Sequence, residues 1–232
     1  MSERSPSRSG RKGAERPKES GSSTDAESSP ILELLAVFVI VFVVQAITAF
    51  LGAMAGLFVL APPLANNPWT IVTSVYAHDG AGHLLSNSVA LVLFGWPVAR
   101  ATTRIRFHTF FLVAGALAGV SQILVTGALA SLPIVAVAPT GSVLGASGAV
   151  FALLGYLLAS NRLSDAFASV IDVPGWVSLA VFLVLAAIVT LATAQPGVAL
   201  VAHFTGFLLG LIAGRAGALE SGSRGRGKRT RA

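Results

Sequence analysis

The chain alternates between long apolar runs and short polar connections. Six runs have the length and composition of membrane-crossing helices, which need about 20 apolar residues. They cover approximately residues 31–60, 83–99, 107–129, 146–160, 175–194 and 198–218. The first run is long enough to tilt or to protrude from a bilayer, and the fourth is short. The pattern predicts an all-α membrane protein, namely a bundle of six transmembrane helices with a short central fourth helix.

The two ends of the chain differ from this apolar middle. Residues 1–30 are rich in Ser, Arg, Lys, Glu and Pro and contain too few apolar residues to bury a core. They are predicted to form a disordered N-terminal tail. Residues 219–232 form a short basic C-terminal tail rich in Arg and Gly. The predicted organisation is therefore a membrane domain over residues 31–218 between two polar tails.

Positive charge is confined to alternate connections between the runs. Of the 16 Lys and Arg, six precede the first run, three are Arg100, Arg104 and Arg106, one is Arg162, and six lie from Arg215 onward. The connections 61–82, 130–145 and 195–197 contain none. Lys and Arg collect on the cytoplasmic side of membrane proteins. The pattern therefore predicts a multi-pass protein of the cell membrane with both termini in the cytoplasm.

Composition supports the membrane assignment and limits the chemistry. The chain is 54% hydrophobic and 11% charged, whereas a soluble domain carries about 25% charged residues. Its net charge of +6 comes mostly from the C-terminal tail, where it suits anionic lipid headgroups. No nucleic-acid recognition module accompanies that charge, so nucleic acid is not an expected partner. The sequence has no cysteine, which excludes disulfides and thiolate catalysis.

Two polar residues lie inside apolar runs, where a hydroxyl and an imidazole are costly and usually functional. Ser147 stands at the start of the fourth run and His203 about five residues into the sixth. A serine becomes a nucleophile when a neighbouring base takes its proton. No acidic residue occurs at the depth of His203. The pair therefore suggests a Ser-His dyad rather than a triad with a carboxylate.

Glycines surround both candidate residues. Gly145 and Gly148 flank Ser147 and permit close backbone approach, although a packing face of small residues would have the same appearance. Gly206 and Gly210 share a helical face with His203 and would let another helix approach it. The alternative for His203 is a structural histidine that bonds to a carbonyl group.

A third group of polar residues occurs around the start of the second run. His83 and Asn87 are four positions apart, so they point the same way on a helix. Both can donate hydrogen bonds to an oxyanion, with the backbone N–H of Ser147 as a further donor. Metal binding by His78, Asp79 and His83 is the rival interpretation. Their spacing does not suit a metal site, so none is predicted.

The connection 130–145 is apolar but broken by Pro133, Pro139 and Gly141. Irregular backbone at membrane depth is tolerated only when protein or a wet cavity surrounds it. The connection is therefore expected to dip into the bundle, with an ordinary external loop as the alternative.

These motifs resemble the rhomboid family of intramembrane serine proteases. The resemblance rests on the segment from His78 to Asn87, on Gly145-Ala146-Ser147-Gly148, and on Ala202-His203-Phe204-Thr205-Gly206 with Gly210. It implies that Ser147 is the nucleophile and His203 the general base. It further implies that His83 and Asn87 complete the oxyanion hole and that His78 supports them. The position four after the serine, often tyrosine in the family, is Phe151 here.

The resemblance implies an endopeptidase that cleaves membrane-anchored proteins within or next to their transmembrane segment, near the external face. Its expected partners are transmembrane protein substrates and the lipid bilayer, and no cofactor is expected. One alternative is a catalytically inactive rhomboid-like protein that binds membrane clients. A small transporter is a weaker alternative, because transporters favour inverted repeats and a midplane site, whereas the polar groups here lie at shallow depth.

Overall fold

The structure, a computed structural model, describes residues 29–134, 136–160, 175–195 and 197–220. Most of both predicted tails lies outside the described residues, and so does Arg162. Every regular element in the described part of the chain is helical, as the sequence predicts. The elements are α1 (Pro30–Phe50), α2 (Met54–Phe58), α3 (Thr70–Thr73), η1 (Ser74–Tyr76), α4 (Ala81–Ala90), η2 (Leu91–Gly95), α5 (Trp96–Ala99), α6 (Arg104–Ala130), α7 (Ser147–Ala159), α9 (Gly175–Ala192) and α10 (Leu200–Arg215).

The first helix is shorter than its apolar run. Helix α1 begins with Pro30, a residue favoured in the first turn, and has Glu33 near its positive end. It ends at Phe50 instead of continuing to residue 60. Gly52 follows with a φ of 73°, a left-handed conformation that closes helices. The expected helix over 31–60 is therefore wrong in its last ten or so positions, although the sequence there stays apolar.

Within the described residues, three helical segments are long and apolar enough to cross a membrane. They are Pro30–Phe50, Ala81–Ala99 and Arg104–Ala130, whereas Ser147–Ala159, Leu179–Ala192 and Leu200–Arg215 are shorter apolar helices. The second segment is continuous through α4, η2 and α5. Its π-helical turn η2 directly precedes α5, in which Pro97 lacks the N–H that would bond to the carbonyl of Leu93. The six-span topology stays a prediction.

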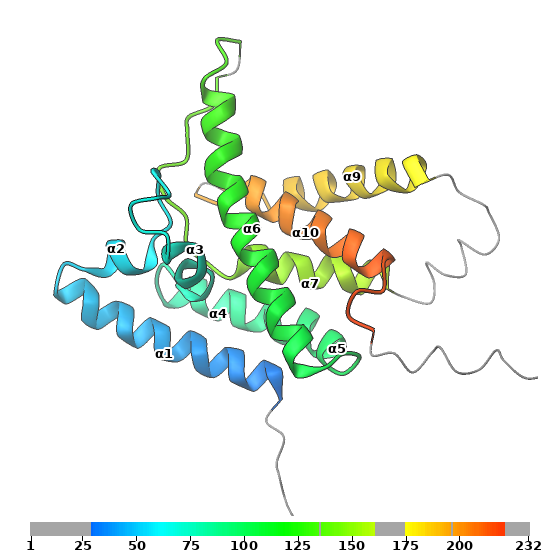
Figure 1. Cartoon of the computed structure of the whole chain (residues 1–232), viewed down its shortest axis with the longest axis horizontal. Helices are drawn as coiled ribbons and strands as arrows, with labels where there is room; N and C mark the ends of the chain where they lie inside the picture. Colours follow the sequence, from blue (N-terminus) through cyan, green and yellow to red (C-terminus); the bar gives the residue numbers. More distant parts are fainter. Residues whose placement is uncertain (1–28, 135, 161–174, 196, 221–232) are drawn as a thin grey trace, which may run out of the picture.

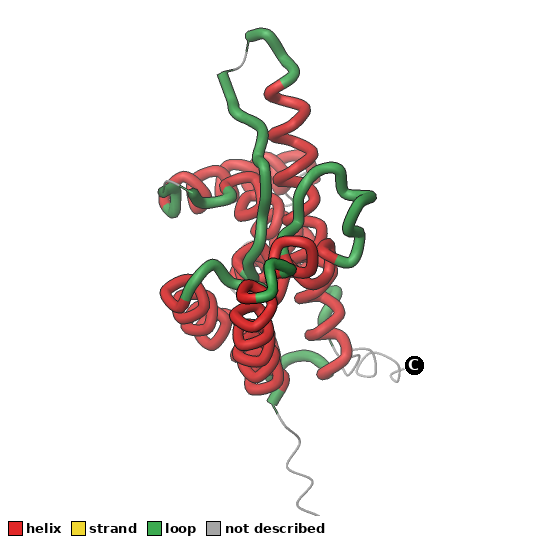
Figure 2. Tube along the Cα trace, turned by 90° about the vertical axis from the view of Figure 1, so that its left-hand side faces the viewer, coloured by secondary structure: helices red, strands yellow, loops and turns green. Residues whose placement is uncertain are grey.

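The helices that begin near the candidate motifs share one direction. Figure 1 shows that α4, α7 and α10 start on the same side of the bundle, while α1 and α9 run the opposite way. Helix α6 crosses the others at a steep angle, and its end protrudes from them in Figures 1 and 2. The starts of three helices thus come together although they are far apart in sequence.

Helix α7 forms the centre of the bundle and packs most extensively on α10 and α6. Glycines remove the side chains between α7 and α10. A Cβ atom on Gly206 would overlap the carbonyl oxygen of Gly148, and one on Gly210 would overlap that of Ala152. Gly155 of α7 faces the carbonyl oxygen of Phe207 in the same way. The two backbones are therefore in direct contact along several turns.

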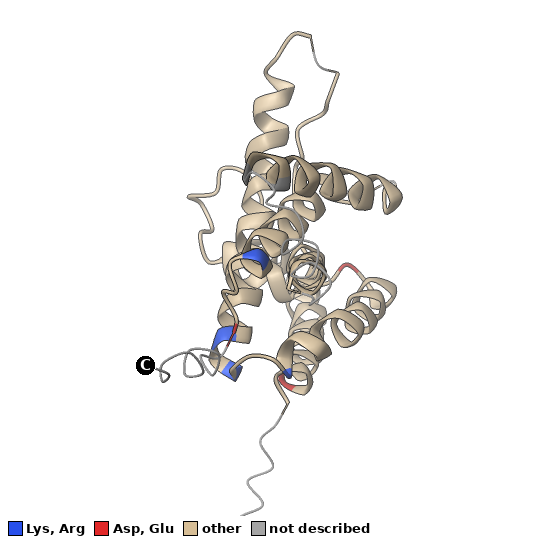
Figure 3. Cartoon of the chain, turned by 90° about the vertical axis from the view of Figure 1, so that its right-hand side faces the viewer, with Lys and Arg blue, Asp and Glu red and all other residues tan. Residues whose placement is uncertain are grey.

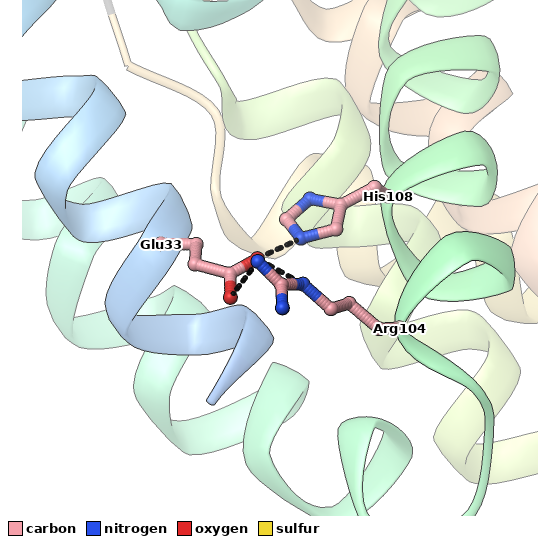
Figure 4. Close-up of polar contacts among 3 residues, drawn as sticks. All are labelled: Glu33, Arg104 and His108. Carbon is pink, nitrogen blue, oxygen red and sulfur yellow. Dashed lines mark hydrogen bonds and ion pairs between the residues drawn. The ribbon is translucent and has the colours of Figure 1, made fainter. Parts of the chain in front are cut away.

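An ionic cluster joins α1 to α6 at the end of the bundle remote from the start of α7. Glu33 bonds to Arg104 at 2.6 Å and to Nε2 of His108 at 2.8 Å (Figure 4). Thr103 caps α6 by accepting a hydrogen bond from the N–H of Arg106. The cluster is partly exposed, so its main effect is to fix which ends of α1 and α6 meet rather than to stabilise the fold.

The described basic residues lie at one end of the helices. Arg100, Arg104 and Arg106 surround the junction of α5 and α6, and Arg215 ends α10. In Figure 3 all blue ribbon lies away from the protruding end of α6. Arg100 follows the segment that α4 begins, and Arg215 ends α10, so both lie at the end opposite to the side on which α4, α7 and α10 begin (Figure 1).

The close contact between α7 and α10 predicts that a larger residue at Gly210 destabilises the fold. Gly210→Ala should lower the free energy of unfolding by about 2 kcal/mol or more, because the added methyl group meets backbone that cannot move aside. Gly127→Ala is the matched control, since a Cβ atom there meets nothing within 4 Å. Thermal unfolding in detergent would measure both. Equal midpoints for the two variants would contradict the described packing.

Candidate active site

The candidate base lies at the contact between α7 and α10. The ring of Phe151 stacks on the imidazole of His203 with centroids 4.1 Å apart and planes at 17°. His203 is 8% exposed, and its Nδ1 atom has no hydrogen-bond partner within the described residues. The imidazole is therefore held by stacking and by its place in the first turn of α10.

The candidate nucleophile is the first residue of α7. Ser147 is half-buried and lines a cavity of about 20 Å³ together with Gly145, Gly148 and Ala202. That volume is about enough for one water molecule. The first N–H groups of a helix have no partner within the helix and carry partial positive charge. Ser147 thus combines an accessible hydroxyl with backbone donors.

Ser147 and His203 belong to the same helix pair, but their side chains are not bonded to each other. No hydrogen bond joins Ser147 Oγ to His203 among the residues described. Catalytic hydrogen bonds are often long before substrate binds and tighten in the complex. The described structure therefore has the two helices in contact and the His203 ring oriented, without a hydrogen bond between Ser147 and His203.

The segment before Ser147 is anchored by backbone hydrogen bonds. Leu60 and Val143 exchange two of them, at 2.9 and 2.8 Å, and the N–H of Gly145 donates to the carbonyl of Ser74 at 2.9 Å. Gly145 has a φ of 135°, which side-chain-bearing residues rarely adopt. These contacts fix the direction in which the chain enters α7.

Most of the preceding connection does not dip into the bundle. Its described residues from 131 to 139 are exposed, and the chain is half-buried only at Thr140 and from Val143 onward. The expectation of a loop inside the bundle thus holds only for the end of the connection. Two long-range bonds account for that end, since Thr140 accepts from Gln122 Nε2 at 2.8 Å and donates its N–H to Thr126 at 3.0 Å.

The candidate oxyanion donors lie beside Gly145. The N–H of Asp79 donates to Nδ1 of His83 at 3.2 Å. A Cβ atom on Gly145 would lie 2.7 Å from Cε1 and 2.9 Å from Nε2 of the His83 ring, so this edge of the ring packs on the chain just before Ser147. Asn87, 5% exposed, has no partner for Nδ2 within the described part of the chain. A buried donor without a partner is costly, which makes Asn87 a candidate to bind a ligand atom.

His78 lies behind His83 in the interior. It is 2% exposed and makes edge-on contacts with Phe38 at 4.8 Å and with His83 at 5.3 Å between ring centroids. Burial, together with the smaller effect of the nearby His83, lowers the pKa of His78 to about 4. His78 is therefore neutral at physiological pH and acts as a packing residue.

Two residues outside the sequence motifs hold these parts in place. Gln45 on α1 bonds to the backbone of His78. Gln122 on α6 accepts a hydrogen bond from the N–H of Ala202, next to His203, at 3.0 Å. Both are amides inside apolar helices. The criterion that identified Ser147 and His203, a polar group in an apolar run, also applies to them.

The arrangement suits acyl transfer better than metal chemistry. Within the described residues, no group of three or more His, Cys, Asp and Glu side chains could hold a metal ion. A hydroxyl at a helix start, an imidazole on the adjoining helix and several unpaired donors are the parts that nucleophilic catalysis on a carbonyl requires.

The sequence is similar to a known protein family. A family model described as Rhomboid domain matches residues 65–219, about two thirds of the chain. No curated protein matches the sequence. Together with its long apolar helices, the family match makes this a membrane protein.

Gly145 provides a test of the local geometry. Gly145→Ala should lower the free energy of unfolding by about 1–3 kcal/mol, because its φ is strained for alanine. It should also displace the His83 ring, which would shift the nitrogen resonances of His83 in an NMR spectrum. Gly141→Ala, on the same connection with nothing within 4 Å of its Cβ, should change neither. Identical behaviour of the two variants would refute the described contact.

Proposed function

The chain belongs to the rhomboid family, and from that premise we propose that it is an intramembrane serine endopeptidase with Ser147 and His203 as its catalytic dyad. The observation that carries the proposal is the contact of α7 with α10. Phe151 stacks on His203 from the second turn of α7, one turn beyond Ser147. Ser147 and His203 therefore belong to adjoining first turns on the side where both helices begin (Figure 1).

In the proposed reaction, His203 accepts the proton of Ser147 as the Ser147 oxygen attacks the substrate carbonyl. The tetrahedral intermediate carries its negative charge on the former carbonyl oxygen. Nε2–H of His83, Nδ2 of Asn87 and the Ser147 N–H would bind this oxygen, and one such donor is worth about 3 kcal/mol. His203 then gives the proton to the departing amine. Water hydrolyses the acyl-enzyme by the same steps with His203 again as base.

The proposed base acts without a carboxylate. Phe151 restricts the His203 ring to one plane, and Gln122 holds the backbone one residue before it. These contacts orient the imidazole in place of the third member of a triad. A rigid ring needs little rearrangement to approach Ser147, which lies at the start of the adjoining helix.

The proposed substrates are transmembrane proteins with a single span, small residues at the cut and a helix weak enough to unwind. They would reach the dyad through the lipid bilayer. Large apolar side chains on the outer face of α1 support this setting: Val39, Ile40, Val43, Ile47 and Phe50 are all more than half exposed. Lipid is the medium in which such a surface is stable.

The proposed topology has six spans, both termini in the cytoplasm and the dyad near the external face of the cell membrane. The described arginines support it, because they lie at the ends of helices opposite to the starts of α4, α7 and α10. Water would then reach Ser147 from outside.

Replacement of the dyad tests the proposed activity directly. Ser147→Ala and His203→Ala should each reduce cleavage of a generic transmembrane substrate in detergent by at least about a thousandfold, because the two residues act as one unit. Ser142→Ala and His108→Ala are the matched controls and should keep wild-type cleavage. Electrophoresis of the cleaved substrate gives the measurement.

The same series separates the protease from its alternative. A serine-reactive fluorophosphonate should label the wild type and fail to label Ser147→Ala. A folded wild type that neither labels nor cleaves would instead support an inactive rhomboid-like protein that binds membrane clients. Full cleavage by Ser147→Ala would refute the assignment of the nucleophile.

The topology can be tested by cysteine labelling, since the sequence has no cysteine of its own. Ser131→Cys and Ala101→Cys place single thiols at exposed positions after α6 and before it. A membrane-impermeant maleimide added to intact cells should label Ser131→Cys and leave Ala101→Cys unlabelled until the membrane is broken. The reverse pattern would invert the proposed orientation.

A further inference from the structure

Helix α1 exposes mainly apolar side chains, but it also carries one buried amide side chain, that of Gln45. Gln45 is 4% exposed, and a polar side chain at membrane depth needs partners because lipid offers none. Gln45 bonds to the carbonyl group and to the N–H group of one residue, His78, on another segment. Gln45 Nε2 donates to the carbonyl of His78 at 3.3 Å, and Gln45 Oε1 accepts from the N–H of His78 at 2.9 Å.

This pair of bonds fixes the peptide groups on either side of His78. The partners are 33 positions apart in sequence, so the clamp ties α1 to the turn that leads into α4. The buried His78 ring packs on Phe38, which lies two turns earlier on α1. The backbone and the side chain of His78 are therefore both held by α1.

The next residue uses the fixed backbone to hold His83. The N–H of Asp79 donates to Nδ1 of His83 at 3.2 Å. A backbone N–H can only donate, so Nδ1 must be the accepting nitrogen of this ring. In the neutral imidazole the single ring hydrogen then lies on Nε2. The bond thus selects one of the two neutral tautomers.

The selected nitrogen is the one that faces the site. The Cε1–Nε2 edge of His83 packs on Gly145, two residues before Ser147, while Nδ1 lies on the side of Asp79. The opposite tautomer would turn an acceptor toward the oxyanion and repel it. A rotated ring would lose the Asp79 bond.

We propose that Gln45 is a positioning residue of the active site. It holds the His78–Asp79 turn so that His83 presents Nε2–H toward the chain that carries Ser147. This role rests on the proposed function, because it concerns the oxyanion donor of that reaction. Gln45 itself touches neither the substrate nor Ser147; it acts through two backbone groups and one ring.

The first measurement uses the wild-type protein. Labelling of the imidazole nitrogens with ¹⁵N, in lipid or detergent, should show His83 with a hydrogen on Nε2 and none on Nδ1. The chain has four histidines, so comparison with His83→Asn assigns the signals. A hydrogen on Nδ1 of His83 would overturn the proposal whether or not the protein cleaves substrate.

The second measurement uses Gln45→Met, which keeps the length of the side chain and removes both hydrogen bonds. It should lower kcat about tenfold with little change in KM, because the donor is misoriented rather than lost. Its His83 signals should show both tautomers or exchange between them. An unchanged kcat together with unchanged His83 signals would overturn the proposal.

Two variants on the same helix serve as controls. Leu34→Ala removes apolar packing at a residue only 1% exposed and should lower the thermal midpoint while keeping kcat and the His83 signals. Thr48→Ala removes a hydroxyl that bonds only within α1 and should change none of them. If Leu34→Ala loses as much kcat as Gln45→Met at an equal loss of stability, the effect is structural and the proposal fails.

The two readouts keep this inference separate from the proposed function. A wild type without proteolytic activity would refute the proposed reaction, yet the tautomer of His83 would still report whether the clamp acts as described. An active wild type with the predicted tautomer, and a Gln45→Met variant with normal kcat and an altered tautomer, would refute the catalytic part alone.

Discussion

The bundle depends on the direct contact between the backbones of α7 and α10. Glycines at Gly206 and Gly210 remove the side chains that would separate them. The close approach stabilises the helix pair by van der Waals contact, because the hydrophobic effect does not favour association of helices in lipid. The same helix contact brings the ring of Phe151 flat against the imidazole of His203. Stability of the bundle and orientation of the candidate base therefore have the same origin.

Two buried amide side chains, those of Gln45 and Gln122, position the other segments around the candidate site. Gln45 reaches from α1 to the backbone before α4, and Gln122 reaches from α6 to the backbone of α10 next to His203. Each would be costly if left unpaired in an apolar interior, and Gln122 also donates to Thr140 on the connection before α7. Their bonds therefore specify which parts of the chain meet, whereas the apolar packing around them is less selective.

The general architecture follows from the sequence because apolar runs must form helices in lipid. The helices, their order and the candidate residues Ser147 and His203 could be predicted from the apolar runs and the polar residues within them. The end of α1 could not be predicted, because the residues after Phe50 remain apolar and the end of the helix depends on the conformation of Gly52. The bonds from Gln45 to His78 and from Leu60 to Val143 join positions far apart in sequence. Such pairings depend on the folded arrangement, which no local pattern encodes.

The stacking of Phe151 on His203 also bears on charge. When the imidazole takes a proton it becomes a cation, and no carboxylate is bonded to it in the described structure. The face of a phenyl ring carries partial negative charge and attracts a cation within about 6 Å of its centre, by about 0.5–2 kcal/mol. At 4.1 Å, Phe151 can provide part of the electrostatic stabilisation that a triad obtains from its acid. A bundle poor in acidic residues can in this way stabilise a transient positive charge in its interior.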